Sequence, residues 1–203
     1  MCFIWLTDFF NVILKIAKMP QEWKHSTIIP LCKNKGDAQN FNNYQGIELL
    51  SHTMKLWERV IEGRLRMDIK ISENQFGFML GRSTIEAIHL IRRFVEFYRD
   101  RKRDLYMVFI DLEKAYDRIP REILWRYLEK RGVSVEYMRV IKDMYDEVRT
   151  RVRILVGDTD NFSIDIGLHQ GSALSPFLFT IVMESSLEGF KMRYLGVCYL
   201  LTT

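Results

Sequence analysis

The sequence predicts an α+β domain, with a mainly antiparallel sheet and packed helices. Two kinds of pattern favour this class. Stretches with apolar residues three or four positions apart predict helices, and short apolar or alternating runs between them predict strands. Their order along the chain, which is helices, a strand, two helices, a hairpin and a last helix, is typical of an α+β domain.

The composition is that of an ordinary globular protein. Of the 203 residues, 48% are hydrophobic and 28% are charged, which excludes a disordered chain and suffices for one good core. The net charge of +4 permits a polyanionic partner without requiring one. The three cysteines lie far apart, and no apolar stretch has the length of a membrane span. We therefore expect an intracellular protein, cytoplasmic or nuclear, without a disulfide framework, a transmembrane segment or a signal peptide.

The N-terminal part predicts two helices on either side of a short strand. Residues 3–18 have a helical pattern that ends at Met19–Pro20, and residues 26–31 form a short apolar strand. A polar turn with two lysines follows at residues 32–37. The second helix runs from about residue 51 to residue 67.

A third helix follows a loop that contains two glycines. Ser83 or Thr84 can cap its N-terminus, and Glu86 favours a helix start there. The spacing of its apolar residues predicts one buried face, made of Ile85, Ile88, either Ile91 or Leu90, Val95 and Tyr98.

An unbroken apolar run from Leu105 to Ile110 ends at Asp111. A run of this length between charged residues predicts a strand that is buried on both faces. A carboxylate at the tip of such a strand is costly unless it is solvated, paired or bound to a metal, and Mg²⁺ prefers carboxylates together with substrate phosphates. Asp111 is therefore a candidate metal ligand. The alternatives are an ion pair with Lys114 or the cap of a turn, and Asp117 is most simply a turn former or helix cap.

The C-terminal half predicts three helices and a hairpin. Pro120 fits the first turn of a helix that runs to about Lys130, and Ser134 caps the next helix. Residues 151–156 alternate as a half-exposed strand and turn at Gly157–Asp158 into a second strand at residues 162–166. A loop follows, and Pro176 opens an apolar helix to about Leu187.

Several other side chains are candidates for binding. Tyr116 is either the wall of a pocket or a core tyrosine, and the pattern alone favours the core. Gln170 and Gly171 precede a helix, whose N-terminus attracts phosphate. The four histidines show no spacing typical of a metal site. Basic residues are surface charges individually, but together they could follow a nucleic-acid backbone; they include Lys33, Lys35 and Arg82.

Several stretches form a set with a family resemblance. They are residues 28–31, 33–37, 43–47, 75–78 and 81–84, then Phe-Ile-Asp-Leu-Glu-Lys-Ala-Tyr-Asp at 109–117 and Gly-Leu-His-Gln-Gly-Ser-Ala-Leu-Ser-Pro at 167–176. Their order and spacing resemble the reverse transcriptase domain of non-LTR (LINE-type) retrotransposons, most of all those of plants. The resemblance covers about residues 20–183.

The resemblance implies a right-hand polymerase, with its fingers and a partial palm in residues 25–183 and a helical extension in residues 1–24. It implies that Asp111 is the first catalytic, metal-binding aspartate and that Tyr116 screens the sugar 2′ position. Gln170 and Gly171 would lie beside the incoming nucleotide and template, and Lys33, Lys35 and Arg82 near triphosphate or template. The implied activity is RNA-directed DNA polymerisation by two Mg²⁺ ions, on an RNA template, a DNA primer and dNTP.

The sequence also departs from that family. Gln45 stands where the family usually has arginine, and Leu80 where it usually has proline. The second carboxylate pair, an aromatic-x-Asp-Asp turn, is absent. Codons compatible with the last ten residues spell Val-Pro-Trp-Cys-Met-Leu-Phe-Ala-Asp-Asp in another frame, which resembles the missing turn.

We therefore expect residues 184–203 to be an out-of-frame tail and this chain to be inactive. The alternatives to a polymerase fragment are a non-catalytic nucleic-acid-binding remnant and a degenerate product without a selected role.

Overall fold

The fold combines a cluster of helices with one open, mixed sheet. The computed structural model describes residues 2–32, 37, 39–40 and 43–187. In chain order the elements are α1 Cys2–Ile16, the short 3-10 helix η1 Gln21–Lys24, β1 His25–Cys32, β2 Tyr44–Leu49, α2 His52–Asp68, α3 Thr84–Asp100, α4 Ala115–Arg118, α5 Arg121–Lys130, α6 Val135–Tyr145, β3 Arg149–Ile154, β4 Gly157–Asp158, β5 Phe162–Ser163 and α7 Ser175–Leu187. No helix in the described ranges is long and apolar enough to cross a membrane.

The sheet has five strands in the order β2-β1-β3-β4, and β5 also pairs with β3. Three pairings are antiparallel, but β1 and β3 run parallel, with Ile28 opposite Val152. Strand β2 was not predicted, because Gln45, Gly46 and Glu48 interrupt its apolar pattern. The predicted turn at Gly157–Asp158 is wrong: these two residues form β4, and the turn falls on the two residues before them.

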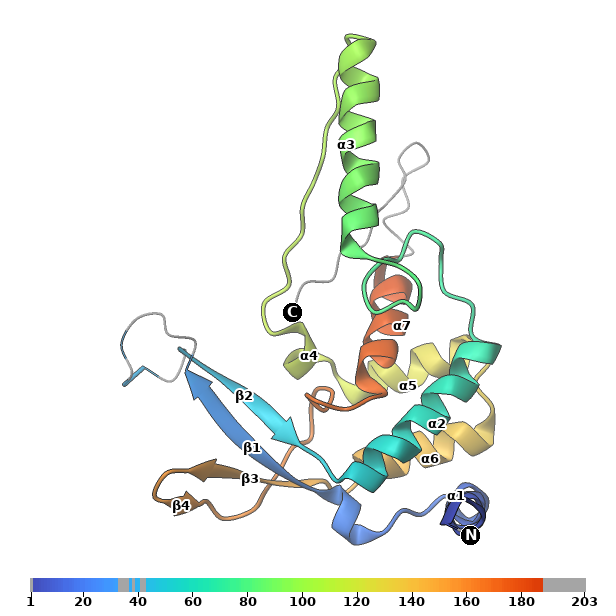
Figure 1. The fold of residues 1–203 in the computed structure, drawn as a ribbon, viewed down its shortest axis with the longest axis vertical. Helices are drawn as coiled ribbons and strands as arrows, with labels where there is room; N and C mark the ends of the chain where they lie inside the picture. The colour runs from blue at the N-terminus through green and yellow to red at the C-terminus, as the bar shows by residue number, and fades with distance from the viewer. Residues whose placement is uncertain (1, 33–36, 38, 41–42, 188–203) are drawn as a thin grey trace.

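Five helices form the hydrophobic core beside the sheet. Figure 1 shows α1, α2, α5, α6 and α7 gathered on one side of the molecule, with the sheet on the other. The side chains that fill the core are less than a tenth exposed and include Phe10, Ile13, Trp57, Ile61, Leu65, Leu124, Leu128, Ile141, Met144, Phe177, Leu178 and Ile181. Most of the amphipathic patterns in the sequence thus point to the core as predicted.

A buried ion pair fastens the segment after α1 to α6. The Asp143 carboxylate accepts hydrogen bonds from the Met19 amide at 2.8 Å and from the Lys24 ammonium at 3.0 Å. Lys24 is only 3% exposed. Lys18, which is exposed, adds a third contact at 3.2 Å. Asp143 thus neutralises a buried cation and satisfies a backbone donor at once.

Two apolar stretches that were predicted to be buried are exposed. Helix α3 begins as expected, since Ser83 Oγ accepts from the Glu86 amide at 3.2 Å, but Ile85 is 75% exposed and Ile88 44%. The run from Leu105 to Ile110 is not a strand, and Val108 is 85% exposed. Figure 1 shows α3 projecting from the helices, with the extended run beside it. A doubly buried strand needs neighbouring strands and covering layers, and the described ranges supply neither here.

Candidate functional site

A short loop before α7 joins three parts of the fold. Residues 167–174 lie against the segment around α4, where the Gly167 amide donates to Ile119 O and the Leu168 amide to Tyr116 O, both at 2.9 Å. Gln170 Nε2 donates to Asp117 Oδ1 at 2.7 Å. Because a carboxylate only accepts hydrogen bonds, this contact fixes which end of the Gln170 amide faces Asp117. Asp117 therefore orients a predicted binding residue, which is a role that the sequence pattern did not suggest.

Two glycines let the loop approach other backbone closely. Gly167 and Gly171 have φ of 83° and 86°, a region that favours glycine. A Cβ on Gly167 would lie 2.8 Å from Asp117 O, and a Cβ on Gly171 would lie 2.6 Å from Glu48 O in β2. The loop thus fills the junction between the sheet and α4 with no room for a side chain at either glycine.

Replacing Gly171 by alanine should destabilise the fold far more than replacing Gly132. Both glycines have positive φ, but a Cβ on Gly132 meets nothing within 4 Å. Gly132→Ala should therefore cost only the conformational strain, about 1 kcal/mol. Gly171→Ala adds a collision with the β2 backbone, and we expect a loss of at least about 2 kcal/mol more in chemical unfolding. Equal losses for the two variants would show that the loop does not press on β2.

The buried Glu58 carboxylate accepts two hydrogen bonds from the loop. Glu58 in α2 accepts from Ser172 Oγ at 2.6 Å and from the Ala173 amide at 2.8 Å. Ser172 Oγ in turn accepts from the Leu174 and Ser175 amides, both at 3.1 Å, at the N-terminus of α7. Burial raises the pKa of Glu58 to about 7, although these two hydrogen bonds act against the rise. Glu58 thus links α2 to the first turn of α7 across the loop.

A neutral histidine lies under the same loop. His169 is 4% exposed and stacks on the Tyr145 ring, with centroids 4.4 Å apart. Burial, and then the charge of Arg121, lower the pKa of His169 to about 3. The Tyr145 hydroxyl shares a hydrogen bond with Ser175 Oγ at 3.2 Å, and burial raises the pKa of Tyr145. His169 is therefore a structural group here and not a proton donor at neutral pH.

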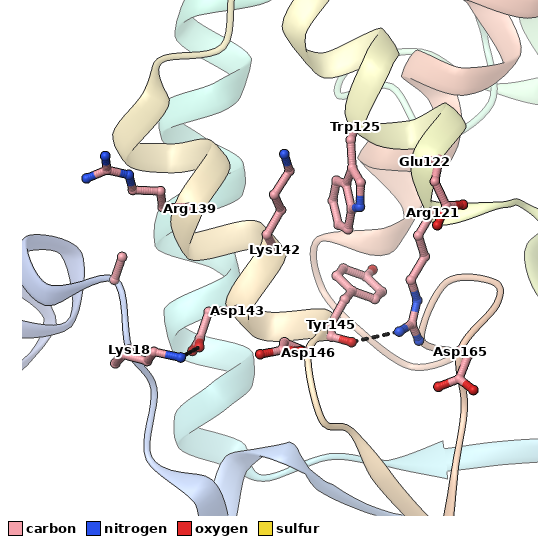
Figure 2. Close-up of a pocket in the computed structure, with 11 residues that line it drawn as sticks. Lys18, Arg121, Glu122, Trp125, Arg139, Lys142, Asp143, Tyr145, Asp146 and Asp165 are labelled. Carbon is pink, nitrogen blue, oxygen red and sulfur yellow. Dashed lines mark hydrogen bonds and ion pairs between the residues drawn. The ribbon is translucent and has the colours of Figure 1, made fainter.

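Arg121 completes this buried network. One guanidinium nitrogen donates to Tyr145 O at 2.7 Å and the other to Ile164 O, and desolvation lowers its pKa. Figure 2 shows Arg121 reaching toward the end of α6, in a cavity of about 630 Å³. Four cationic and four carboxylate side chains line this cavity, so its lining does not favour one sign of charge.

Tyr116 lies at the junction, and Asp111 lies beside a second cavity. The Tyr116 ring is half-buried and stacks on Phe179 at 4.4 Å, and burial raises its pKa. It is therefore packed against the core, as its sequence pattern favoured. It lies next to the loop, whose Leu168 amide donates a hydrogen bond to the Tyr116 carbonyl. Asp111 is exposed, contrary to the expected buried strand tip, and lines a cavity of about 390 Å³ together with Glu113, Arg118 and Phe179.

Of the three predicted basic residues, the structure describes only Arg82. Arg82 pairs with Glu86 at 2.7 Å and lies over the Phe76 ring at 5.2 Å, so it helps to start α3. Lys33 and Lys35 lie outside the described residues.

The carboxylates do not fit a two-metal centre. Within the described ranges, no three side chains of His, Cys, Asp or Glu come together as a metal site. Glu113 pairs with Arg118 at 3.5 Å, and Asp117 is engaged by Gln170. Asp111 alone cannot supply the ligands that two ions require.

Comparison with known proteins decides the family. Residues 32–201 match the family described as "Reverse transcriptase (RNA-dependent DNA polymerase)". The chain belongs to the reverse transcriptase family. Its non-LTR retrotransposon type, expected from the sequence, is confirmed by the relatives, while the closer likeness to plant elements stays a prediction.

Three relatives are longer proteins, of which the chain matches only a part. It is 31% identical to the "Probable RNA-directed DNA polymerase from transposon BS" of Drosophila melanogaster, over 88% of the chain and 20% of that protein. It is 29% identical to the "RNA-directed DNA polymerase from mobile element jockey" of the same species, over 85% and 19%. It is 26% identical to the "Retrovirus-related Pol polyprotein from type-1 retrotransposable element R2" of Popillia japonica, over 89% and 25%. The chain thus spans a fifth to a quarter of these relatives.

Proposed function

We propose that this reverse transcriptase domain supplies the fingers and the first part of the palm, in residues 25–183, behind a helical extension in residues 1–24. It binds an RNA template with a DNA primer, and dNTP, inside the cell in the nucleus or cytoplasm. The observation that carries this proposal is the junction where Tyr116, Asp117 and Gln170 are held together. In this arrangement Tyr116 screens the sugar 2′ position, while Gln170 and Gly171 face the nucleotide and template. Lys33, Lys35 and Arg82 contact phosphate.

We also propose that the chain does not polymerise by itself. Polymerisation by the family uses divalent ions, Mg²⁺ in our expectation, held by Asp111 and a second carboxylate pair. The 203 residues contain no aromatic-x-Asp-Asp turn. Residues 184–203 are then a tail read out of frame. Sequencing the gene tests this idea. It is wrong if no alternative frame encodes Phe-Ala-Asp-Asp opposite the last residues.

Binding without extension is the result that we expect from the purified chain. A primed RNA template should be retained in a filter assay, and the logarithm of its affinity should fall with the logarithm of salt concentration, by about 0.7 per phosphate contacted on a single strand. Incorporation of dNTP should not exceed that of the Asp111→Ala variant. Incorporation above this control would refute the inactivity, and salt-independent or absent retention would refute the binding. In the second case a degenerate product without a selected role is the better reading.

A further inference from the structure

Gln170 and Gly171 lie between two buried carboxylates that come from different parts of the fold. Glu48 in β2 is 5% exposed, and Glu58 in α2 is 1% exposed. On the β2 side, Gly171 packs against the Glu48 carbonyl, and the backbone amide of Gln170 interacts with the Glu48 carboxylate. On the α2 side, Glu58 binds the next two residues of the loop. The loop is therefore held immediately before and immediately after Gly171.

The loop presents two hydrogen-bond donors to Glu58 and no free acceptor. The Ser172 hydroxyl donates to one carboxylate oxygen at 2.6 Å, and the Ala173 amide donates to the other at 2.8 Å. Both lone pairs of Ser172 Oγ are already used, because the Leu174 and Ser175 amides donate to it. A carboxylate supplies the two acceptors that this arrangement needs. A glutamine side chain supplies one, and its NH2 group would point at a donor or at an occupied oxygen.

The charge of Glu58 is costly at this position. Within the described residues, Glu58 makes no ion pair. Burial raises its pKa to about 7, and the two hydrogen bonds from the loop are the largest contributions that act against the rise. An uncharged side chain of the same shape would fill the position at a lower cost of desolvation. Groups with such shifts concentrate at binding and catalytic sites, which indicates a role beyond packing.

We propose that Glu58 is a positioning residue for the part of the loop that meets nucleotide and template. Its two carboxylate oxygens fix the following residues of the loop, and thereby hold Gly171 against β2 and Gln170 near Asp117. The inference rests on the proposed function, which places Gln170 and Gly171 at the nucleotide. Glu58 itself touches neither ligand, so its substitution should change how tightly they bind without removing a phosphate contact.

Amide hydrogen exchange tests the positioning in the full-length chain, at about pH 8, where Glu58 is ionised. Glu58→Gln keeps the shape of the side chain and removes one acceptor, and we expect residues 168–173 to exchange at least about tenfold faster while α2 is unchanged. Glu62→Gln, one turn later on α2, is the matched control, because Glu62 pairs with Arg66 and not with the loop. Unchanged exchange in the loop, or an equal rise along α2, overturns the proposal. If Glu58→Gln does not fold, Glu58→Asp, which keeps the charge but is shorter, gives the same readout.

Retention of a primed RNA template in a filter assay tests the consequence for binding. Glu58→Gln should raise the dissociation constant about fivefold and leave the salt dependence and the fraction retained at saturation unchanged. A variant that merely unfolds would instead lower the fraction retained. Gln170→Ala should raise the constant by a similar factor. The double variant should bind no more than about twofold weaker than Gln170→Ala alone, because Glu58 acts through Gln170, and additive effects contradict this.

The two experiments separate this inference from the proposed function. Wild-type protein that retains no template, or Gln170→Ala that binds like wild type, refutes the proposed function, and exchange in the loop then decides the inference alone. Template binding that Gln170→Ala weakens but Glu58→Gln leaves unchanged refutes the positioning role while the proposed function stands.

Discussion

Asp143→Ala should lower the free energy of unfolding by about 3–5 kcal/mol, the largest effect of any single change that we expect here. The substitution leaves the Lys24 ammonium, which is 3% exposed, without its partner at 3.0 Å. It also removes the acceptor of the Met19 amide. A buried cation with no counter-charge must either be rehydrated by local opening or lose its proton, and each route costs stability.

Urea unfolding followed by circular dichroism measures this loss. The double variant Asp143→Leu/Lys24→Met removes both charges and should recover most of it, because a buried pair replaced by apolar groups is nearly neutral. Asp146→Ala, on an exposed residue just after α6, is the matched control and should change stability by less than about 0.5 kcal/mol. A loss below about 1 kcal/mol in Asp143→Ala would mean that the ion pair contributes little to the fold.

The second large effect is a pH dependence set by two buried groups under the loop. Burial raises the pKa of Glu58 from 4.5 to about 7. Between these values the folded protein keeps a proton that the unfolded chain has released, so the free energy of unfolding falls as the pH rises. At about 1.4 kcal/mol per pKa unit, the loss approaches about 3 kcal/mol above pH 7. Burial also raises the pKa of Glu48, which acts in the same direction.

His169 has the opposite effect. Its pKa falls from 6.5 to about 3, so between these values the unfolded chain takes up a proton that the folded protein excludes. The free energy of unfolding therefore falls as the pH decreases, by up to about 5 kcal/mol below pH 3. Between pH 4.5 and 6.5 the two groups offset each other, and the wild type should vary little.

Single variants should separate the two contributions. In Glu58→Gln, the free energy of unfolding should rise with pH from 4.5 to 6.5 more steeply than in wild type. In His169→Phe, which keeps a ring against Tyr145, it should fall over the same range. His89→Gln, on the exposed surface of α3, should follow the wild type. Parallel profiles for wild type and both variants would show that neither group is held in its buried protonation state.

The sequence predicts where most helices and strands lie, but it predicts less well which strands pair with each other. Helices α1, α2, α3, α5, α6 and α7 lie close to the expected ranges, because their apolar spacing and caps are local signals. Strand β2 has no such signal and forms because β1 offers it an edge. The run from Leu105 to Ile110 shows the converse, since a strong strand pattern stays exposed where no neighbouring strand is described.

The candidate site divides in the same way. Gln170 and Tyr116 were expected at a site, and the loop contacts bring them together. Asp117, Glu58 and His169 were not expected to support it, because their roles depend on contacts across the fold. Asp117 meets Gln170 across 53 positions, and Glu58 meets Ser172 across 114. A single sequence carries no local trace of such pairs.

The contacts of the N-terminal segment decide where a recombinant fragment of this domain can begin. The family match begins at residue 32, yet Phe10 packs its ring 5.0 Å from that of Trp57. A recombinant fragment that started at residue 32 would uncover that side of α2 and leave Asp143 buried without Met19 and Lys24. The unit that folds therefore starts earlier than the family match does, and expression trials should keep the first helix.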